Sequence, residues 1–283
     1  MTGQEWWRQP EESPWYPQKP QELVIPGRPD EYRGYDEWFE PVPQRKLAEV
    51  AEGIRSRLNG GWWPPPPPGG KYIEHGEMSG GTDACAFYRS FRYPKGFGIH
   101  VCVECWAGLA EWIYCHGVLD EAAVDEAFAL LYRHELFHFA VDRTSLFLER
   151  VVESATGVAP DLWIAYHRRN KPSRLEEALA NAFAFEHAGK RWAADGLEEI
   201  IKEAVGRVMR AQPQGYCDFE DVMGREKSAA RAQLLNDILG VHGRGLSYVP
   251  DMALIWAPPS LATRRSGYPS MKFEGRPLDL YLY

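Results

Sequence analysis

The sequence predicts an α+β fold in which a long helix lies beside a small, mostly antiparallel sheet, with an extended proline- and tryptophan-rich arm at the N-terminus. The long helix is predicted between Asp120 and about Val141, where acidic residues open the segment and apolar residues recur at helical spacing. The sheet is predicted from two alternating segments, 84–93 and 97–105, which a Pro-Lys-Gly turn joins into a hairpin.

The N-terminal quarter of the chain differs in composition from the rest. Residues 1–70 hold 13 of the 22 prolines and 6 of the 11 tryptophans. So many prolines oppose a helical or sheet domain, and so many aromatic residues are unusual for a disordered tail. We expect an extended arm over residues 1–70, with one short helix at about 45–58, lying on a second unit over residues 71–283. A partner-binding arm, or a cover over a functional site, is the alternative.

Composition and charge narrow the class of protein. The chain is 45% hydrophobic and 25% charged, as is usual for a globular protein. A formal net charge of −8 argues against a general nucleic-acid or anionic-membrane partner, because phosphate groups are bound by basic patches. No apolar run is long enough to cross a bilayer, and the first residues lack the layout of a signal peptide. We therefore expect a cytoplasmic protein without nucleic-acid or membrane partners.

The five cysteines are an odd number, which does not favour a disulfide framework. Cys102 and Cys105 form a C-x-x-C pair, followed by the adjacent residues Cys115 and His116. A four-ligand zinc site needs two spaced pairs, so adjacent ligands fit it poorly. The apolar surroundings favour buried thiols where a strand runs into a helix, with a second metal site as the alternative.

The remaining segments complete the predicted fold. Apolar residues at helical spacing predict helices over 106–117, 196–211 and 219–239. The C-terminal tail mixes loops with two strand-like pieces, 253–256 and 278–283. The sequence contains no internal repeat, phosphate-binding loop, nucleophile elbow or dinucleotide-binding fingerprint.

The long helix carries a pattern that is typical of a metal site, His134-Glu135-Leu136-Phe137-His138. Two histidines four residues apart lie on one face of a helix, so both imidazoles can reach a single ion. Glu135, one step round the helix, can take a proton from water beside that ion. Because unpaired imidazoles are costly on a buried helix, the pattern predicts half of a zinc site with Glu135 as a general base.

A third ligand is expected further along the chain, because catalytic zinc usually has three protein ligands. Ser173 followed by Glu176 predicts a capping box that opens a helix and turns Glu176 back to its own N-terminus. Glu177 can then face a neighbouring helix, and its face continues into alanines that allow close approach. Glu177 is the predicted third ligand, with Glu176 as the alternative and Glu153 as a more distant one.

Two polar residues are candidates for holding the ligands in place. Asp142 follows His138 by one turn and could accept the second ring proton of that histidine. An exposed carboxylate at the end of the helix is the equal alternative. Asn181 follows Glu177 by one turn and is a candidate for the same role.

Two motifs carry a resemblance to a known family: His134-Glu135-x-x-His138, and Glu177-x-x-Ala180-Asn181-x-Phe183-Ala184. Together they resemble the zincin metallopeptidases whose third ligand is a glutamate on a second helix, and are most similar to the ImmA/IrrE-like group. The resemblance spans about residues 84–188, with a further helix-like run at 145–155 between the motifs. It implies a zincin-like catalytic domain, a Zn²⁺ ion held by both histidines and Glu177, and a protein or peptide substrate.

Amide hydrolysis also calls for a donor to the oxyanion, besides the metal. Tyr166 and His167 precede the second motif and could reach over the site as catalytic residues, and His242 could do so from a glycine-rich loop. The expected function is a zinc-dependent endopeptidase. The alternatives are a hydrolase of another substrate and a non-catalytic zinc-containing module that binds partners through its Trp/Pro-rich arm. A general base at Glu135 favours an enzyme, because a structural zinc needs none.

Overall fold

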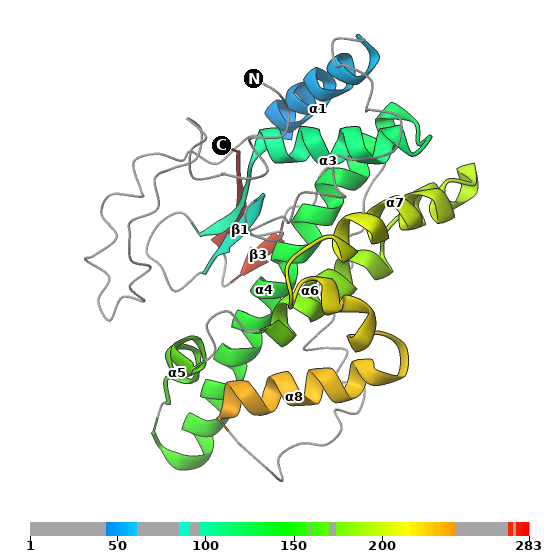
Figure 1. The fold of residues 1–283 in the computed structure, drawn as a ribbon. Helices are drawn as coiled ribbons and strands as arrows, with labels where there is room; N and C mark the ends of the chain where they lie inside the picture. Colours follow the sequence, from blue (N-terminus) through cyan, green and yellow to red (C-terminus); the bar gives the residue numbers. More distant parts are fainter. Residues whose placement is uncertain are drawn as a thin grey trace.

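The computed structural model of the chain describes residues 44–60, 85–90, 97–158, 160–169, 174–240, 271–273 and 276–282. Helices dominate the described residues, and η marks a 3-10 helix (Figure 1). The elements in chain order are α1 (Gln44–Asn59), β1 (Ala86–Arg89), β2 (Gly98–Val101), α3 (Val103–Cys115), α4 (Asp120–Thr156), α5 (Leu162–Arg169), α6 (Arg174–Glu186), η4 (Lys190–Asp195), α7 (Glu198–Arg210), η5 (Cys217–Val222), η6 (Gly224–Glu226), α8 (Lys227–Leu239), β3 (Met271–Phe273) and β4 (Arg276–Leu282).

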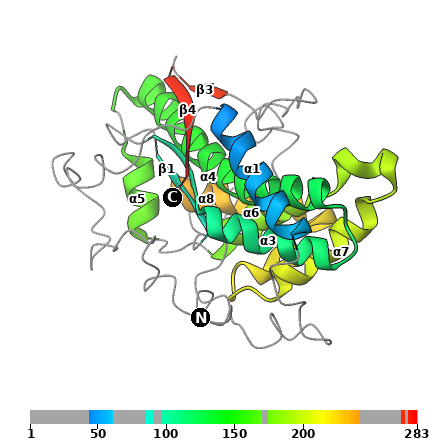
Figure 2. The same ribbon diagram turned by 90° about the horizontal axis from the view of Figure 1, so that it is seen from above.

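Helix α4 is the axis around which the other elements pack. It runs through the middle of the molecule, with the strands on one side and α6 and α7 on the other (Figure 1). Helices α1 and α3 lie near its N-terminal end, and α5 lies beside its C-terminal half (Figures 1 and 2). Trp106 of α3 is fully buried, and its Nε1 donates to the carbonyl of Val124 at 2.8 Å, which ties α3 to α4.

Helix α4 is longer than the sequence predicted. It does not end near Val141 but continues to Thr156, so the helix-like run at 145–155 is part of it and not a separate helix. The hydroxyls of Thr144 and Ser145 donate to carbonyls one turn back, at 2.8 and 3.1 Å, and are therefore compatible with an uninterrupted helix. The helix ends only at Gly157, whose backbone adopts the left-handed conformation with φ 72°.

The described strands form one four-stranded sheet in the order β1-β2-β4-β3. The predicted hairpin is confirmed, since β1 and β2 are antiparallel with Ala86 opposite Val101 and Arg89 opposite Gly98. β4 pairs parallel with β2 and antiparallel with β3, so two of the three pairings are antiparallel. β2 is shorter than predicted because α3 begins at Val103. His100 alternates with the core residues Ile99 and Val101, yet it is also fully buried and stacks on Phe87 at 4.4 Å.

Helix α6 is buried on nearly all sides because it packs between α4 and several other elements. Every residue from Glu176 to Ala184 is buried. The helix packs against α4 on one side and against α7, α8 and η5 on the other. Ala180 and Ala184, the small residues expected at the helix–helix contact, are fully buried, and α6 packs against α4.

Other predicted segments differ from the structure in their limits. The segment 219–239 was predicted as one helix, but η5 and η6 precede α8, and Gly224, the first residue of η6, has φ 59°. Helix α5 and strand β3 were not predicted.

The strand-like piece 253–256 lies outside the described residues, as does most of the expected arm. Its one described element, α1, packs against α3 and α4. Among the described residues, no helix has both the length and the apolar composition needed to cross a membrane.

Candidate metal centre

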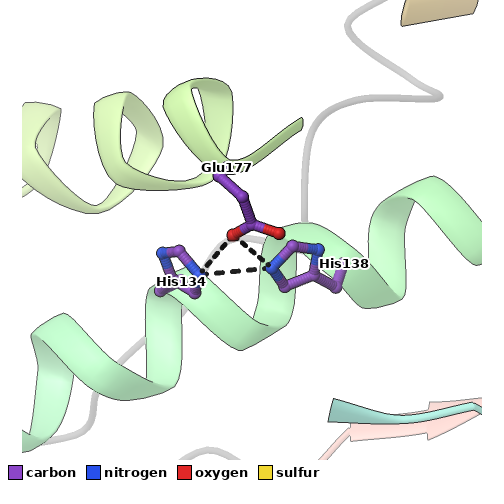
Figure 3. A group of neighbouring side chains, drawn as sticks. All are labelled: His134, His138 and Glu177. Carbon is purple, nitrogen blue, oxygen red and sulfur yellow. Dashed lines mark hydrogen bonds and ion pairs between the residues drawn. The ribbon is translucent and has the colours of Figure 1, made fainter. Parts of the chain in front are cut away.

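Helices α4 and α6 bring His134, His138 and Glu177 together, with the carboxylate of Glu177 pointing at the two rings (Figure 3). The Nε2 atoms of the two histidines lie 3.2 Å apart. The Oε2 atom of Glu177 lies 3.2 Å from Nε2 of His134 and 3.5 Å from Nε2 of His138. Within the described part of the chain, this is the one group of three or more such side chains that could hold a metal ion.

The three distances between the donor atoms fit a tetrahedrally coordinated metal ion. Donors at zinc-like bonds of about 2.0–2.1 Å in a tetrahedral arrangement lie about 3.3–3.4 Å from one another. The measured separations of 3.2, 3.2 and 3.5 Å bracket that value. Three donor atoms with lone pairs converge here, and such an arrangement is repulsive unless a cation or a proton lies between them. The residues present therefore fit a metal ion.

A hydrogen-bond chain fixes the ring of His134. Its Nδ1 lies 2.8 Å from Oδ1 of Asn181, as expected for that asparagine. The amide nitrogen of Asn181 donates at 2.8 Å to Oε1 of Gln212 and at 2.8 Å to the carbonyl of Tyr216. Because a backbone carbonyl only accepts, the Asn181 amide can have only this orientation, so its oxygen accepts from Nδ1–H of His134. The lone pair of the ring is therefore on Nε2, which faces Glu177.

A second chain fixes the ring of His138. Its Nδ1 donates to Oε1 of Glu176 at 2.7 Å, which leaves the lone pair on Nε2. The other carboxylate oxygen of Glu176 accepts from the hydroxyl of Tyr166 at 2.5 Å. Both carboxylate oxygens of Glu176 therefore bind side chains of other helices, which the sequence did not predict. The partner of Glu176 in the expected capping box, Ser173, lies outside the described residues.

Charges at the centre favour a cation. Burial alone would lower the pKa of His138, but the carboxylates of Glu177 and Glu176 raise that pKa well above its usual value. Burial likewise opposes ionisation of Glu177, yet His138 and His134 lower its pKa to about 2. In the absence of an ion, these shifts favour a proton on the His138 ring, facing an ionised Glu177. A metal ion would take the place of that proton.

Glu135, the predicted general base, is a buried residue of α4. It follows His134 directly on α4, is 1% exposed, and does not belong to the group of converging donors. Its role as a general base remains a prediction.

Asp142 has a different partner from the one predicted. It neither accepts from His138, whose second nitrogen is bound to Glu176, nor lies exposed, since it is 3% exposed. Its Oδ1 accepts a short hydrogen bond from the indole of Trp163 on α5. The sequence did not predict α5, and that helix covers this turn of α4.

The two predicted oxyanion donors lie on α5, outside the group of converging donors. Tyr166 is fully buried, and its hydroxyl is directed at Glu176. Nε2 of His167 lies 3.8 Å from Oδ1 of Asp142. The structure therefore does not bring either residue into the donor group, and His242 lies outside the described residues. Glu153, the distant alternative ligand, is exposed near the end of α4.

Two residues of the centre have no signal in the sequence. Gln212 and Tyr216 lie between α7 and η5, where no periodicity applies. The ring of Tyr216 stacks over that of His134, with centroids 6.0 Å apart and planes at 17°.

The cysteine pair does not belong to the group of converging donors. Cys102 is the N-cap of α3, and Cys105 is buried in the first turn of that helix. The five cysteines, all in described segments, form no disulfide.

Comparisons of the chain with family models, with curated proteins and with solved structures returned no match. A function for this chain is therefore inferred from the geometry of His134, His138 and Glu177.

Proposed function

We propose that the protein is a zinc-dependent endopeptidase in which His134, His138 and Glu177 hold the ion and Glu135 is the general base. The observation that carries the proposal is the convergence of two imidazole nitrogens from α4 and one carboxylate oxygen from α6, 3.2–3.5 Å apart. The buried Glu135 adjoins His134 in the sequence. Three protein donors leave a fourth tetrahedral position open, as in catalytic zinc sites.

The donor set supports zinc over other common ions. Two imidazoles and one carboxylate are frequent zinc ligands, whereas Mg²⁺ and Ca²⁺ prefer sites made of oxygen atoms. Zinc-bound histidines usually donate their second ring N–H to an oxygen acceptor such as a carboxylate or a carbonyl. Here these acceptors are the side chains of Asn181 and Glu176.

The chain's own residues have distinct tasks in the proposed reaction. A bound zinc ion supplies Lewis acidity, which polarises the scissile carbonyl and makes water a stronger acid. Glu135 takes a proton from the attacking water and returns it to the leaving amine nitrogen. Asn181 and Glu176 keep the two imidazoles in the required tautomer and orientation.

A peptide is the substrate class that the fold and the motifs favour. The two motifs resemble those of zincin peptidases, and β1 is the outermost strand on one side of the sheet that the described strands form. β1 also packs against α4, the helix that bears the histidines. An extended peptide could add to such an edge through main-chain hydrogen bonds.

The test replaces the proposed base while keeping its shape. Glu135→Gln should retain one zinc ion per chain and lose hydrolysis of an unfolded, fluorescently quenched protein substrate by about 10²–10⁴-fold, the usual contribution of a general base. Elemental analysis and the rate of fluorescence release measure the two quantities on the same preparation.

Glu153→Gln is the matched control, because it makes the same change at an exposed position on α4. It should keep both the metal and the rate. Equal rates in Glu135→Gln and wild type would contradict the assigned base. A zinc-loaded wild type that cleaves no peptide would refute the peptidase and favour a non-catalytic zinc-containing module.

A further inference from the structure

Helix α5 is held against the metal-bearing helices by three buried carboxylates. The backbone N–H of Trp163 donates to Oε1 of Glu149 at 3.1 Å, and its indole N–H donates to Asp142. The hydroxyl of Tyr166, one turn further, donates to Oε2 of Glu176 at 2.5 Å. The first two contacts anchor α5 to α4, and the third reaches α6 at the residue next to the proposed ligand Glu177.

Glu176 accepts on both carboxylate oxygens. Nδ1–H of His138 lies 2.7 Å from Oε1, and the Tyr166 hydroxyl lies 2.5 Å from Oε2. The terminal torsion of a glutamate is broad, so a single hydrogen bond leaves the carboxylate plane poorly defined. A second donor on the opposite oxygen defines that plane. Bonds to a carboxylate are also shorter and stronger than bonds between neutral groups.

His138 needs this support more than His134 does. The side chain of His134 is fully buried, with Tyr216 stacked on its ring. The side chain of His138 is 14% exposed and is therefore less confined by packing. The direction of its Nε2 depends more on the hydrogen bond at its Nδ1.

We propose that Tyr166 is a positioning residue of the metal centre, acting through Glu176 on the orientation of His138. The proposal rests on the proposed function for the presence of a metal ion at this site. It assigns Tyr166 a different role from that of a donor to the substrate, because its hydroxyl donates to Glu176, which is not one of the converging donors.

The experiment is a double-mutant cycle on metal binding, with Co²⁺ as a spectroscopic probe. Four proteins are titrated with Co²⁺ against a competing chelator: wild type, Tyr166→Phe, Glu176→Gln and the double variant. Outer partners of metal-bound histidines are worth 10–100-fold in affinity. We expect Glu176→Gln to lose affinity in that range and Tyr166→Phe, one bond further out, to lose about tenfold with a shifted visible Co²⁺ band.

The cycle separates action through Glu176 from a general structural effect. If Tyr166 acts through Glu176, Tyr166→Phe should cause little further loss in the Glu176→Gln background. Tyr132→Phe makes the same change at a buried tyrosine of α4 outside the hydrogen-bonded chains described above, and should leave both affinity and spectrum unchanged. Circular dichroism checks that every variant is folded.

Three results would overturn the inference. These are wild-type affinity and spectrum in Tyr166→Phe, losses that add fully in the double variant, and a folded wild type that binds no Co²⁺. The third would also remove the metal centre. Metal binding with the expected cycle but no peptide hydrolysis would refute the peptidase alone, so the two failures are distinguishable.

Discussion

Asn181 shows how single side chains set the chemistry of the centre. Its amide nitrogen is committed to Gln212 and to the carbonyl of Tyr216, which turns its oxygen to His134. The proton of that imidazole is thereby placed on Nδ1 and the lone pair on Nε2. The affinity of the site for a metal thus depends on a residue that is not itself a ligand.

We predict that Asn181→Ala lowers zinc affinity by about 10–100-fold, because His134 loses the acceptor that fixes its tautomer. Competition with a chromogenic chelator measures the affinity. Asn236→Ala is the control, since it removes another buried asparagine, on α8, outside the centre. It should cost stability without changing affinity. Equal affinity losses in the two variants would mean that the effect is general destabilisation.

The ligands could be predicted from spacing, but their partners could not. His134 and His138 follow from helical geometry alone, and Glu177 follows from the need for a third ligand on a closely packed helix. Glu176 was expected to face its own N-terminus, and its bonds to His138 and Tyr166 could not be predicted because both partners lie on other helices. Asp142 was misassigned because its partner Trp163 lies on a helix that the sequence did not predict.

At the scale of elements, Gly189 after α6 is a point where the backbone is closely packed. Gly189 follows α6 with φ 71°, and a Cβ there would lie 2.7 Å from the carbonyl oxygen of Glu198. The backbone N–H of Gly189 also donates a hydrogen bond to the carboxylate of Glu126 on α4. Burial raises the pKa of that carboxyl group. This turn therefore joins α6, α7 and α4 at one point.

We predict that Gly189→Ala destabilises the protein more than Gly196→Ala does. Both glycines have positive φ, 71° and 73°, so both variants carry a backbone strain of about 1–2 kcal/mol. Nothing lies within 4 Å of a Cβ at Gly196, whereas Gly189 adds a collision with backbone worth roughly 1–3 kcal/mol. Urea midpoints at constant slope measure the difference. Equal losses would show that the close approach is not maintained in solution.

The elements themselves could be predicted to different degrees. The apolar period of 120–141 predicted a helix, and the Pro-Lys-Gly sequence between two alternating segments predicted a pair of strands. Neither pattern predicted where α4, β1 and β2 end. Helix α5 was missed because its eight residues depend on Trp163 and Tyr166 reaching buried carboxylates on other helices. Burial of both faces of β2 could not be predicted, because alternation of residues along a strand does not show what covers its second face.

For the molecule as a whole, a metal ion would link segments that are far apart in the chain. The donors come from α4 and α6, which also form one of the largest interfaces between described elements. An ion that binds the folded state and not the unfolded chain stabilises it by mass action.

We predict that removing the metal lowers the thermal midpoint. Free metal at 100 times its dissociation constant stabilises by about 2.7 kcal/mol. Each kcal/mol moves the midpoint of a domain of this size by about 2–4 °C, so a chelator should lower it by roughly 5–10 °C. Differential scanning fluorimetry with and without chelator measures the shift. His134→Ala should start from a lower midpoint and not respond, and a chelator shift that persists in that variant would point to a second site.

The central claim is that His134, His138 and Glu177 hold one metal ion, and metal content tests it most directly. Wild type, Glu177→Gln and Glu153→Gln should be purified without added metal and their zinc measured by elemental analysis. We expect one zinc ion per chain in wild type and in Glu153→Gln, and only a trace in Glu177→Gln. A well-folded wild type without any transition metal, or full occupancy in Glu177→Gln, would contradict the account.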